Sequence, residues 1–139
     1  MALDRKQRIP YAAAAGFLGA ALLLLTAAPA FAKGAMDITV PTHHVRAGRP
    51  VHVSGKGDDD AGRFLRACVQ ERGGDHGAWH TVGCGRVMTS GAGARVEADV
   101  RPAHGGVLQL RGVLYGLSDR DDPHPEELRS SPVTSVSVR

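Results

Sequence analysis

The chain has 139 residues, with 17 basic and 14 acidic side chains and a formal net charge of +3. This length fits a single domain. Three of the basic residues and one acidic residue lie within the first ten positions, so the chain from Lys33 onward carries a charge of only +1. That balance provides no basic surface of the kind that nucleic-acid-binding proteins present, and we expect no nucleic-acid partner.

The N-terminal segment has the pattern of a secretory signal peptide. Its basic start is followed by an uncharged run, 11–32, which ends in Ala30-Phe31-Ala32. Small residues at the −3 and −1 positions, here Ala30 and Ala32, are typical of cleavage before Lys33. An uncleaved membrane anchor is the alternative, because the run is just long enough to span a bilayer. The sequence therefore predicts a signal-peptide helix at 1–32 and a secreted, extracellular domain at 33–139, with membrane contact only if cleavage fails.

Short alternating runs separated by Gly, Pro and Asp fill the rest of the chain. In the run 49–54, for example, Val51 and Val53 fall on one face of an extended chain. This run is expected to stop at Gly55, because glycine and the aspartates that follow disfavour strands. No helical period persists after residue 32, although 125–129 suffices for one short helical turn.

Seven such runs predict an all-β, seven-stranded immunoglobulin-like β-sandwich. The predicted strands are 36–40, 49–54, the two arms of a hairpin within 64–88, then 95–101, 107–115 and 133–138.

The central hairpin carries the two cysteines of the chain. If Cys68 lies opposite Cys84, the numbers of paired residues sum to 152 and the turn centres on His76, within a glycine-rich segment. We predict a disulfide between them, which in an oxidising compartment stabilises a small domain by about 3 kcal/mol. The register opposes Arg66 to Arg86. It also assigns six residues to the core face: Leu65, Ala67, Val69, Thr81, Gly83 and Val87.

Aromatic side chains are scarce in the predicted exported domain. Only Phe64, Trp79 and Tyr115 remain after residue 32. A core this poor in large apolar groups depends on a covalent link. Trp79, at the end of the hairpin turn, is expected to pack over the edge of the sandwich.

The strand patterns resemble the immunoglobulin-like modules of bacterial secreted and surface proteins. The residues that carry the resemblance are Val51-His52-Val53-Ser54-Gly55, Trp79-His80-Thr81-Val82, the run 96–100 and the closing segment 132–138. A narrower resemblance is to the neocarzinostatin family of secreted chromophore-carrying apoproteins. It rests on Val51, Val53, Gly55 and Gly57, on the cysteine pair, on 96–101 and on Gly116-Leu117-Ser118-Asp119. This second resemblance implies a ligand cleft between the hairpin and the strand 107–115.

Two sets of loop residues contain metal-ligating side chains. Alternate loops of such a sandwich gather at opposite ends. One end would collect Asp58, Asp59, Asp60, Asp119, Asp121 and Asp122, whose oxygens suit Ca²⁺. The other would collect His43, His44, His76 and His104, whose nitrogens suit Zn²⁺ or Cu²⁺. Solvated acidic loops and ordinary exposed histidines are the alternatives, and no cofactor is expected.

No nucleophile-elbow or other catalytic pattern occurs in the chain, and we expect no enzymatic activity. The leading hypothesis is a secreted, non-catalytic immunoglobulin-like module that binds an extracellular or cell-envelope macromolecule through its loops or a sheet edge. The alternative is a small-ligand carrier of the neocarzinostatin type.

Overall fold

The structure, a computed structural model, describes residues 34–139. The predicted signal-peptide helix and the anchor alternative lie outside the described residues. Every regular element of 34–139 is a β-strand, and this part of the chain contains no helix suited to crossing a membrane. The ten strands are β1 (Ala35–Thr39), β2 (His44–Val45), β3 (Val51–Asp58), β4 (Phe64–Gly73), β5 (His80–Cys84), β6 (Met88–Thr89), β7 (Ala94–Val100), β8 (Gly106–Leu117), β9 (Glu126–Ser130) and β10 (Thr134–Val138).

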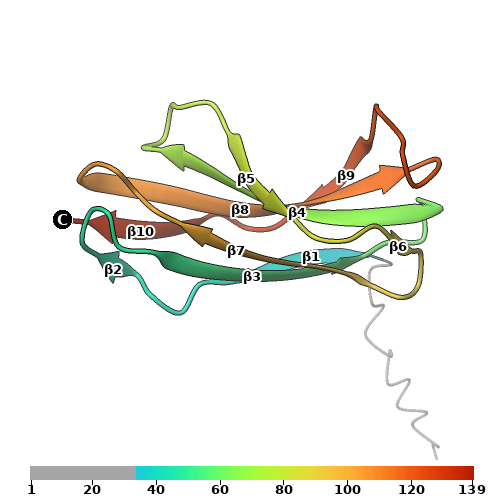
Figure 1. The fold of residues 1–139 in the computed structure, drawn as a ribbon, viewed down its shortest axis with the longest axis horizontal. Helices are drawn as coiled ribbons and strands as arrows, with labels where there is room; N and C mark the ends of the chain where they lie inside the picture. Colours follow the sequence, from blue (N-terminus) through green and yellow to red (C-terminus); the bar gives the residue numbers. More distant parts are fainter. Residues whose placement is uncertain (1–33) are drawn as a thin grey trace, which may run out of the picture. The chain divides into compact units, whose positions relative to one another are not determined.

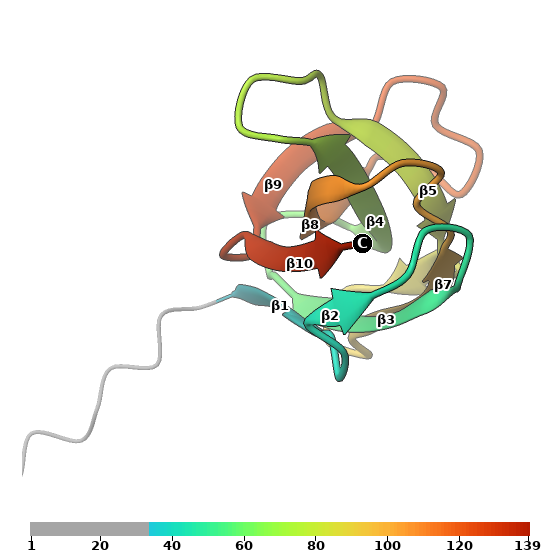
Figure 2. The same cartoon turned by 90° about the vertical axis from the view of Figure 1, so that its left-hand side faces the viewer.

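These strands form two sheets that face each other (Figures 1 and 2). The small sheet has the order β1-β3-β7, and the large sheet has the order β2-β10-β8-β4-β5. Strand β6 also lies beside β4, and β9 lies beside β8. The all-β sandwich is thus confirmed, while the count differs from seven because β2 and β9 are additional short strands and the second hairpin arm is divided into β5 and β6.

The core between the sheets is built almost entirely from aliphatic residues. Alternation along each strand directs these side chains inward. The largest fully buried ones in this core are Leu65, Leu110, Leu114, Val51, Val53, Val69, Val100 and Val136. No aromatic residue belongs to this core within residues 34–139, so the aromatic side chains are left for the surface.

The prediction that the second strand stops at Gly55 is wrong, because β3 continues to Asp58. Side chains from two other strands leave no room for a Cβ at Gly57 within this strand. A Cβ at Gly57 would lie 2.8 Å from the sulfur of Met36 and 3.1 Å from a methyl group of Leu114. The packing of β1 and β8 against β3 therefore outweighs the poor strand propensity of glycine.

The hairpin register is confirmed at the cysteines and then shifts. Cys68 pairs with Cys84 and Val69 with Gly83, but a bulge makes Gln70 pair with Thr81. The bulge exchanges the faces of β5 beyond that point. Val82 consequently packs against the core and Thr81 is exposed, the reverse of the expectation.

The second arm of the hairpin is also interrupted, which removes the expected Arg66–Arg86 opposition. Strand β5 ends at Cys84 and pairing with β4 resumes at Met88. In the gap, a Cβ at Gly85 would collide with the carbonyl oxygen of Arg95. The chain therefore runs against the backbone of β7 there, and Arg86 has no paired position on β4.

The segment expected to form a helical turn is strand β9. It pairs with the last part of β8, with Val113 opposite Ser130 and Gly116 opposite Glu126. Leu128 packs against the core, which gives this polar segment an apolar anchor. This segment is therefore extended because it pairs with the edge of β8.

The loops gather at two ends of the sandwich, as the sequence predicts. Strand β4 begins opposite Leu117 and ends opposite Leu108. The connections 59–63, 90–93 and 118–125 therefore share one end, here called the acidic end. The connections 46–50, 74–79 and 101–105 share the other, here called the basic end (Figure 1).

Candidate functional site

The outer face of the large sheet carries a connected set of polar and aromatic side chains. We call this set the outer-face platform, and it consists of Gln70, Arg72, Trp79, Gln109, Arg111 and Tyr115. Its positions follow from strand alternation. Because Val69 and Leu110 point into the core, their neighbours Gln70 and Arg111 point outward, and the register places these two directly opposite each other.

Gln70 lies at the centre of the platform. Its side-chain oxygen accepts a hydrogen bond from Arg111 Nε at 2.9 Å, and its side-chain nitrogen donates to the Tyr115 hydroxyl at 3.2 Å. The same nitrogen lies 3.5 Å from Thr81 Oγ1 on β5. Gln70 is only 8% exposed, and these bonds satisfy its amide across three strands. The centre of the platform is therefore rigid.

A second chain of hydrogen bonds runs beside the first. Arg72 Nε donates to the side-chain oxygen of Gln109 at 2.6 Å, and Gln109 in turn donates to Asp75 in the β4–β5 turn at 2.7 Å. This chain links the sheet to its hairpin loop. Each arginine of the platform is thus oriented by a glutamine.

Trp79 covers this network. The guanidinium carbons of Arg72 and Arg111 each lie 4.4 Å from its ring centre, within cation–π range. The expected edge packing of Trp79 is replaced by stacking on the outer face, because two cations are held there by Gln109 and Gln70. The ring is partly exposed, so an aromatic surface remains available to a partner.

Tyr115 closes the platform on β8. Burial raises the pKa of its hydroxyl, the nearby Glu127 raises it further, and Arg111 opposes the shift. The phenol is therefore neutral at physiological pH and can donate as well as accept a hydrogen bond. The platform as a whole offers stacking and hydrogen bonding, which suit recognition.

The disulfide lies on the same outer face. Cys68 and Cys84 are joined directly across β4 and β5, as predicted. Cys68 precedes Gln70 by one outward position on β4. The covalent link therefore fixes the strand pair that carries one side of the platform.

The predicted acidic residues are at the acidic end, where they bond to loop backbone. Asp58 accepts from the amides of Asp59 and Gly91, and Asp119 accepts from the amide of Asp121. Asp59 accepts from the Ala61 amide and contacts Arg129. Asp60 and Asp121 are exposed in the same loops.

Asp122 organises the tip of the β8–β9 loop. Its carboxylate accepts from the amides of Ser118 and His124, each at 2.9 Å, and from the Ser118 hydroxyl. These bonds lower its pKa. The carboxylate therefore has a structural role as a loop cap.

The predicted histidines lie towards the basic end, on separate segments. His44 belongs to β2, His76 to the β4–β5 turn and His104 to the β7–β8 connection, while the backbone oxygen of His43 accepts from Ser137 of β10. Within residues 34–139, no three His, Cys, Asp or Glu side chains are arranged to hold a metal ion. The geometry therefore supports neither metal hypothesis.

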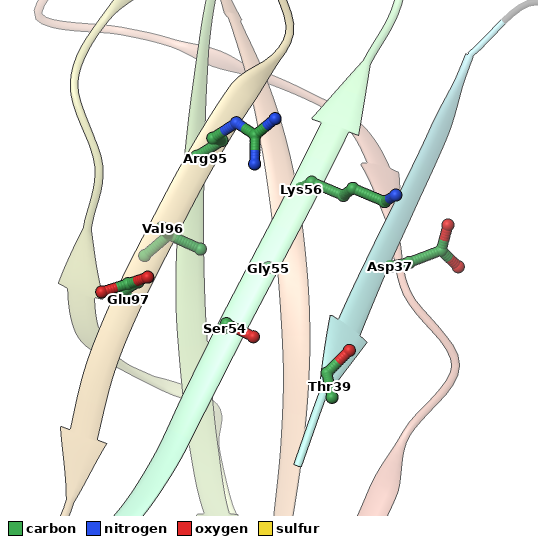
Figure 3. Close-up of a pocket in the computed structure, with 8 residues that line it drawn as sticks. All are labelled: Asp37, Thr39, Ser54, Gly55, Lys56, Arg95, Val96 and Glu97. Atoms are coloured by element: carbon green, nitrogen blue, oxygen red, sulfur yellow. The ribbon is translucent and has the colours of Figure 1, made fainter. Parts of the chain in front are cut away.

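A hollow of about 250 Å³ lies on the outer face of the small sheet (Figure 3). Lys56 lies opposite Asp37 of β1 on one side and opposite Arg95 of β7 on the other. The full lining is Asp37, Thr39, Ser54, Gly55, Lys56, Arg95, Val96 and Glu97. Its charges are of both signs and its only aliphatic side chain, Val96, belongs to the core, so it presents no defined ligand chemistry.

The cleft implied by the neocarzinostatin resemblance is absent between the two segments expected to form it. Strands β4 and β8 are direct neighbours, paired from Phe64 with Leu117 to Gly73 with Leu108. Backbone hydrogen bonds occupy the space in which a ligand would have to lie.

The amino-acid sequence alone predicts no role for Gln70, Arg72, Gln109 or Arg111. One signal was available, because Gln109 and Arg111 alternate with the apolar Leu108 and Leu110. That pattern places two polar side chains on the outer face, but it does not say which strand lies beside them.

No family model matches the chain, and no curated protein matches it in sequence. Among solved structures, it is similar to a CARDB domain from Pyrococcus furiosus that was crystallised in complex with di-metal ions. The TM-score is 0.46 at 12% sequence identity, and the match covers 76% of this chain and 92% of the other. Similarity at this level bears on neither the ligands nor the function of the chain, which is an all-β sandwich on its own geometry.

Proposed function

We propose that this protein is a secreted, non-catalytic immunoglobulin-like module that binds an extracellular or cell-envelope partner through the outer-face platform. The observation that carries the proposal is the stacking of Trp79 on two guanidinium groups that are themselves held by buried or partly buried glutamines. The disulfide supports an oxidising compartment, since such bonds are rare in the cytosol.

Rigid aromatic and arginine side chains are the ones that contribute most to binding at protein surfaces. Their hydrogen bonds within the sheet reduce the ordering that binding would otherwise require. Arg72 and Arg111 each use one donor within the platform, and a guanidinium has five. The remaining donors favour a partner rich in oxygen acceptors.

Fluorescence of Trp79 provides the test, because it is the only tryptophan in the chain. Purified domain would be titrated with macromolecules fractionated from the cell envelope and the growth medium. Binding at the platform should change the emission, because a partner would cover the partly exposed indole.

Arg72→Ala/Arg111→Ala is the variant that separates the platform from the rest of the surface. It keeps the fluorophore and should lose binding of the fraction that the unaltered domain binds. Val107→Ala, at an exposed position on β8, is the matched control and should bind normally. Equal binding by the double variant and the unaltered domain, with both shown to be folded by circular dichroism, would refute the platform as the site.

A further inference from the structure

We propose that the basic end holds a second binding site, specific for phosphoryl oxyanions, in the hollow between β2 and the end of β7. This arginine hollow is lined by His44, Val45, Arg46, Arg49, Pro50 and Arg101 and has a volume of about 840 Å³. It shares no residue with the outer-face platform, so the two proposals stand or fall separately.

Backbone hydrogen bonds hold the arginine-bearing loop in place. The amide of Arg49 donates to the carbonyl of Arg46 at 3.1 Å and closes a tight turn, in which Gly48 adopts a φ of +80°. The Gly48 amide donates to Pro102 at 2.7 Å, and the Ala47 amide donates to the backbone oxygen of Arg139 at 2.8 Å. The turn is therefore tied to two other segments of the chain.

The same bonds fix the third arginine. Arg101 immediately precedes Pro102, whose carbonyl receives the Gly48 amide. Arg46, Arg49 and Arg101 thus project from backbone positions that cannot move independently. The backbone positions of the three exposed arginines are therefore fixed, which reduces the ordering that binding of an anion would require.

No acidic side chain is among the residues that line the hollow, whereas three arginines are. Within residues 34–139, no ion pair or side-chain hydrogen bond is found for the guanidinium groups of Arg46, Arg49 and Arg101. Asp99, the acidic residue closest to Arg101 in sequence, lies on the outer face of the small sheet, where its carboxylate is 3.0 Å from His52 Nδ1. Three like charges around one hollow repel each other, and a bound anion removes that repulsion.

The chemistry of the lining selects the ligand class. Guanidinium groups bind phosphoryl oxygens through two parallel hydrogen bonds, which an ammonium group cannot do. The volume exceeds that of a single ion, so the phosphoryl group can belong to a larger molecule. Free phosphate and the headgroup of an anionic phospholipid are the two sources that the experiment must separate.

The experiment measures binding by the folded domain to two probes, each with a matched control. Isothermal titration uses inorganic phosphate against sodium chloride of equal ionic strength. Sedimentation uses phosphatidylglycerol vesicles against phosphatidylcholine vesicles. We expect Arg46→Ala/Arg49→Ala to weaken binding of the active probe about tenfold or more, because two charge-assisted contacts are lost.

Two further variants make the result specific. Arg46→Lys/Arg49→Lys keeps the charge but loses the paired donors, and should bind clearly less well than the unaltered domain. Arg95→Ala removes an exposed arginine on the outer face of the small sheet and should bind normally.

The outcomes are distinct. Binding of free phosphate supports a phosphate site, and binding of phosphatidylglycerol vesicles alone supports a headgroup site. Absence of binding to all probes beyond the chloride and phosphatidylcholine baselines would overturn the proposal. So would an equal loss in Arg95→Ala, since that result indicates attraction by net charge alone.

Discussion

The two ends of the sandwich carry charges of opposite sign and differ in how those charges are used. At the acidic end, Asp59 and Asp122 each accept backbone hydrogen bonds, and Asp59 also contacts Arg129 across 70 residues of sequence. At the basic end, the connection 46–50 is held by backbone hydrogen bonds. The side chains of its arginines take no part in holding it.

The charged side chains of the acidic end stabilise the fold, whereas the arginines of the basic end do not. The hydrogen bond from Ala61 and then the contact with Arg129 lower the pKa of Asp59, although its burial acts in the opposite direction. A carboxylate whose charged form is stabilised by the fold is already paired. The acidic end therefore uses its charges to hold loops, whereas the basic end leaves its charges open to a ligand.

The largest expected effect on the free energy of unfolding comes from removal of the disulfide. This bond belongs to neither end, so its effect is the reference against which changes at the two ends are compared. Replacing Cys68 and Cys84 by alanine should lower the free energy of unfolding by about 3 kcal/mol, because a link across a separation of 16 residues no longer restricts the unfolded chain. Urea denaturation followed by Trp79 fluorescence measures it. A loss below about 1 kcal/mol would mean that the sheet pairing alone holds β5 in place.

The next effect tests the acidic end. Asp59→Ala removes the partner of Arg129 and an acceptor for the Ala61 amide, and should cost about 1–3 kcal/mol. We expect less than for a fully buried pair, because Arg129 is 37% exposed. Asp121→Ala is the matched control, since the Asp121 carboxylate lies exposed in the same end, and it should be nearly neutral. Equal stability of the two variants would contradict a structural role for Asp59.

Acidification should weaken the same end without any mutation. Asp59 and Asp122 have pKa values below the ordinary 3.8 in the folded state. Groups of this kind favour folding while ionised, so the stabilisation is complete above about pH 4 and is lost as the pH falls through the folded values. Melting temperatures measured from pH 6 to pH 2 should therefore fall steeply at the acidic limit. The melting temperature of Asp59→Asn should be lower at pH 6 and should fall less towards pH 2. Parallel curves for the variant and the unaltered domain would contradict a stabilising role for ionised Asp59.

The part of the fold that depends on neighbours in sequence was predictable. Turn composition and cysteine spacing gave the pairing of Cys68 with Cys84, and the strand parity gave Val51 and Val53 as core residues. The bulge after Val69 was not predictable, because Val82 turns inward only when β7 and the core are in place. The need for glycine at position 57 was not predictable either, because the side chain that excludes a Cβ there belongs to Met36 on another strand.

The candidate sites likewise combine features that the sequence predicts with features that only the tertiary structure shows. Arg46 and Arg49 lie together in one short loop, but their proximity to Arg101 depends on how β2, β3 and β7 end. The central contact of the platform joins Gln70 to Arg111 over a separation of 41 residues. Sequence alternation places each on an outer face, yet only the β4–β8 register brings them together.

The smallest expected effect tests the basic end in the absence of ligand. Arg46→Ala/Arg49→Ala should change the free energy of unfolding by less than about 0.5 kcal/mol at moderate salt, because neither side chain bonds within the described part of the chain. At low salt the variant should be slightly more stable than the unaltered domain, since it relieves repulsion among the three guanidinium groups. The difference should vanish near 1 M salt, where screening acts over about 3 Å. A loss of stability at low salt would instead mean that these arginines hold their loop. The two ends would then differ only in the sign of their charges, and both would use those charges to stabilise loops.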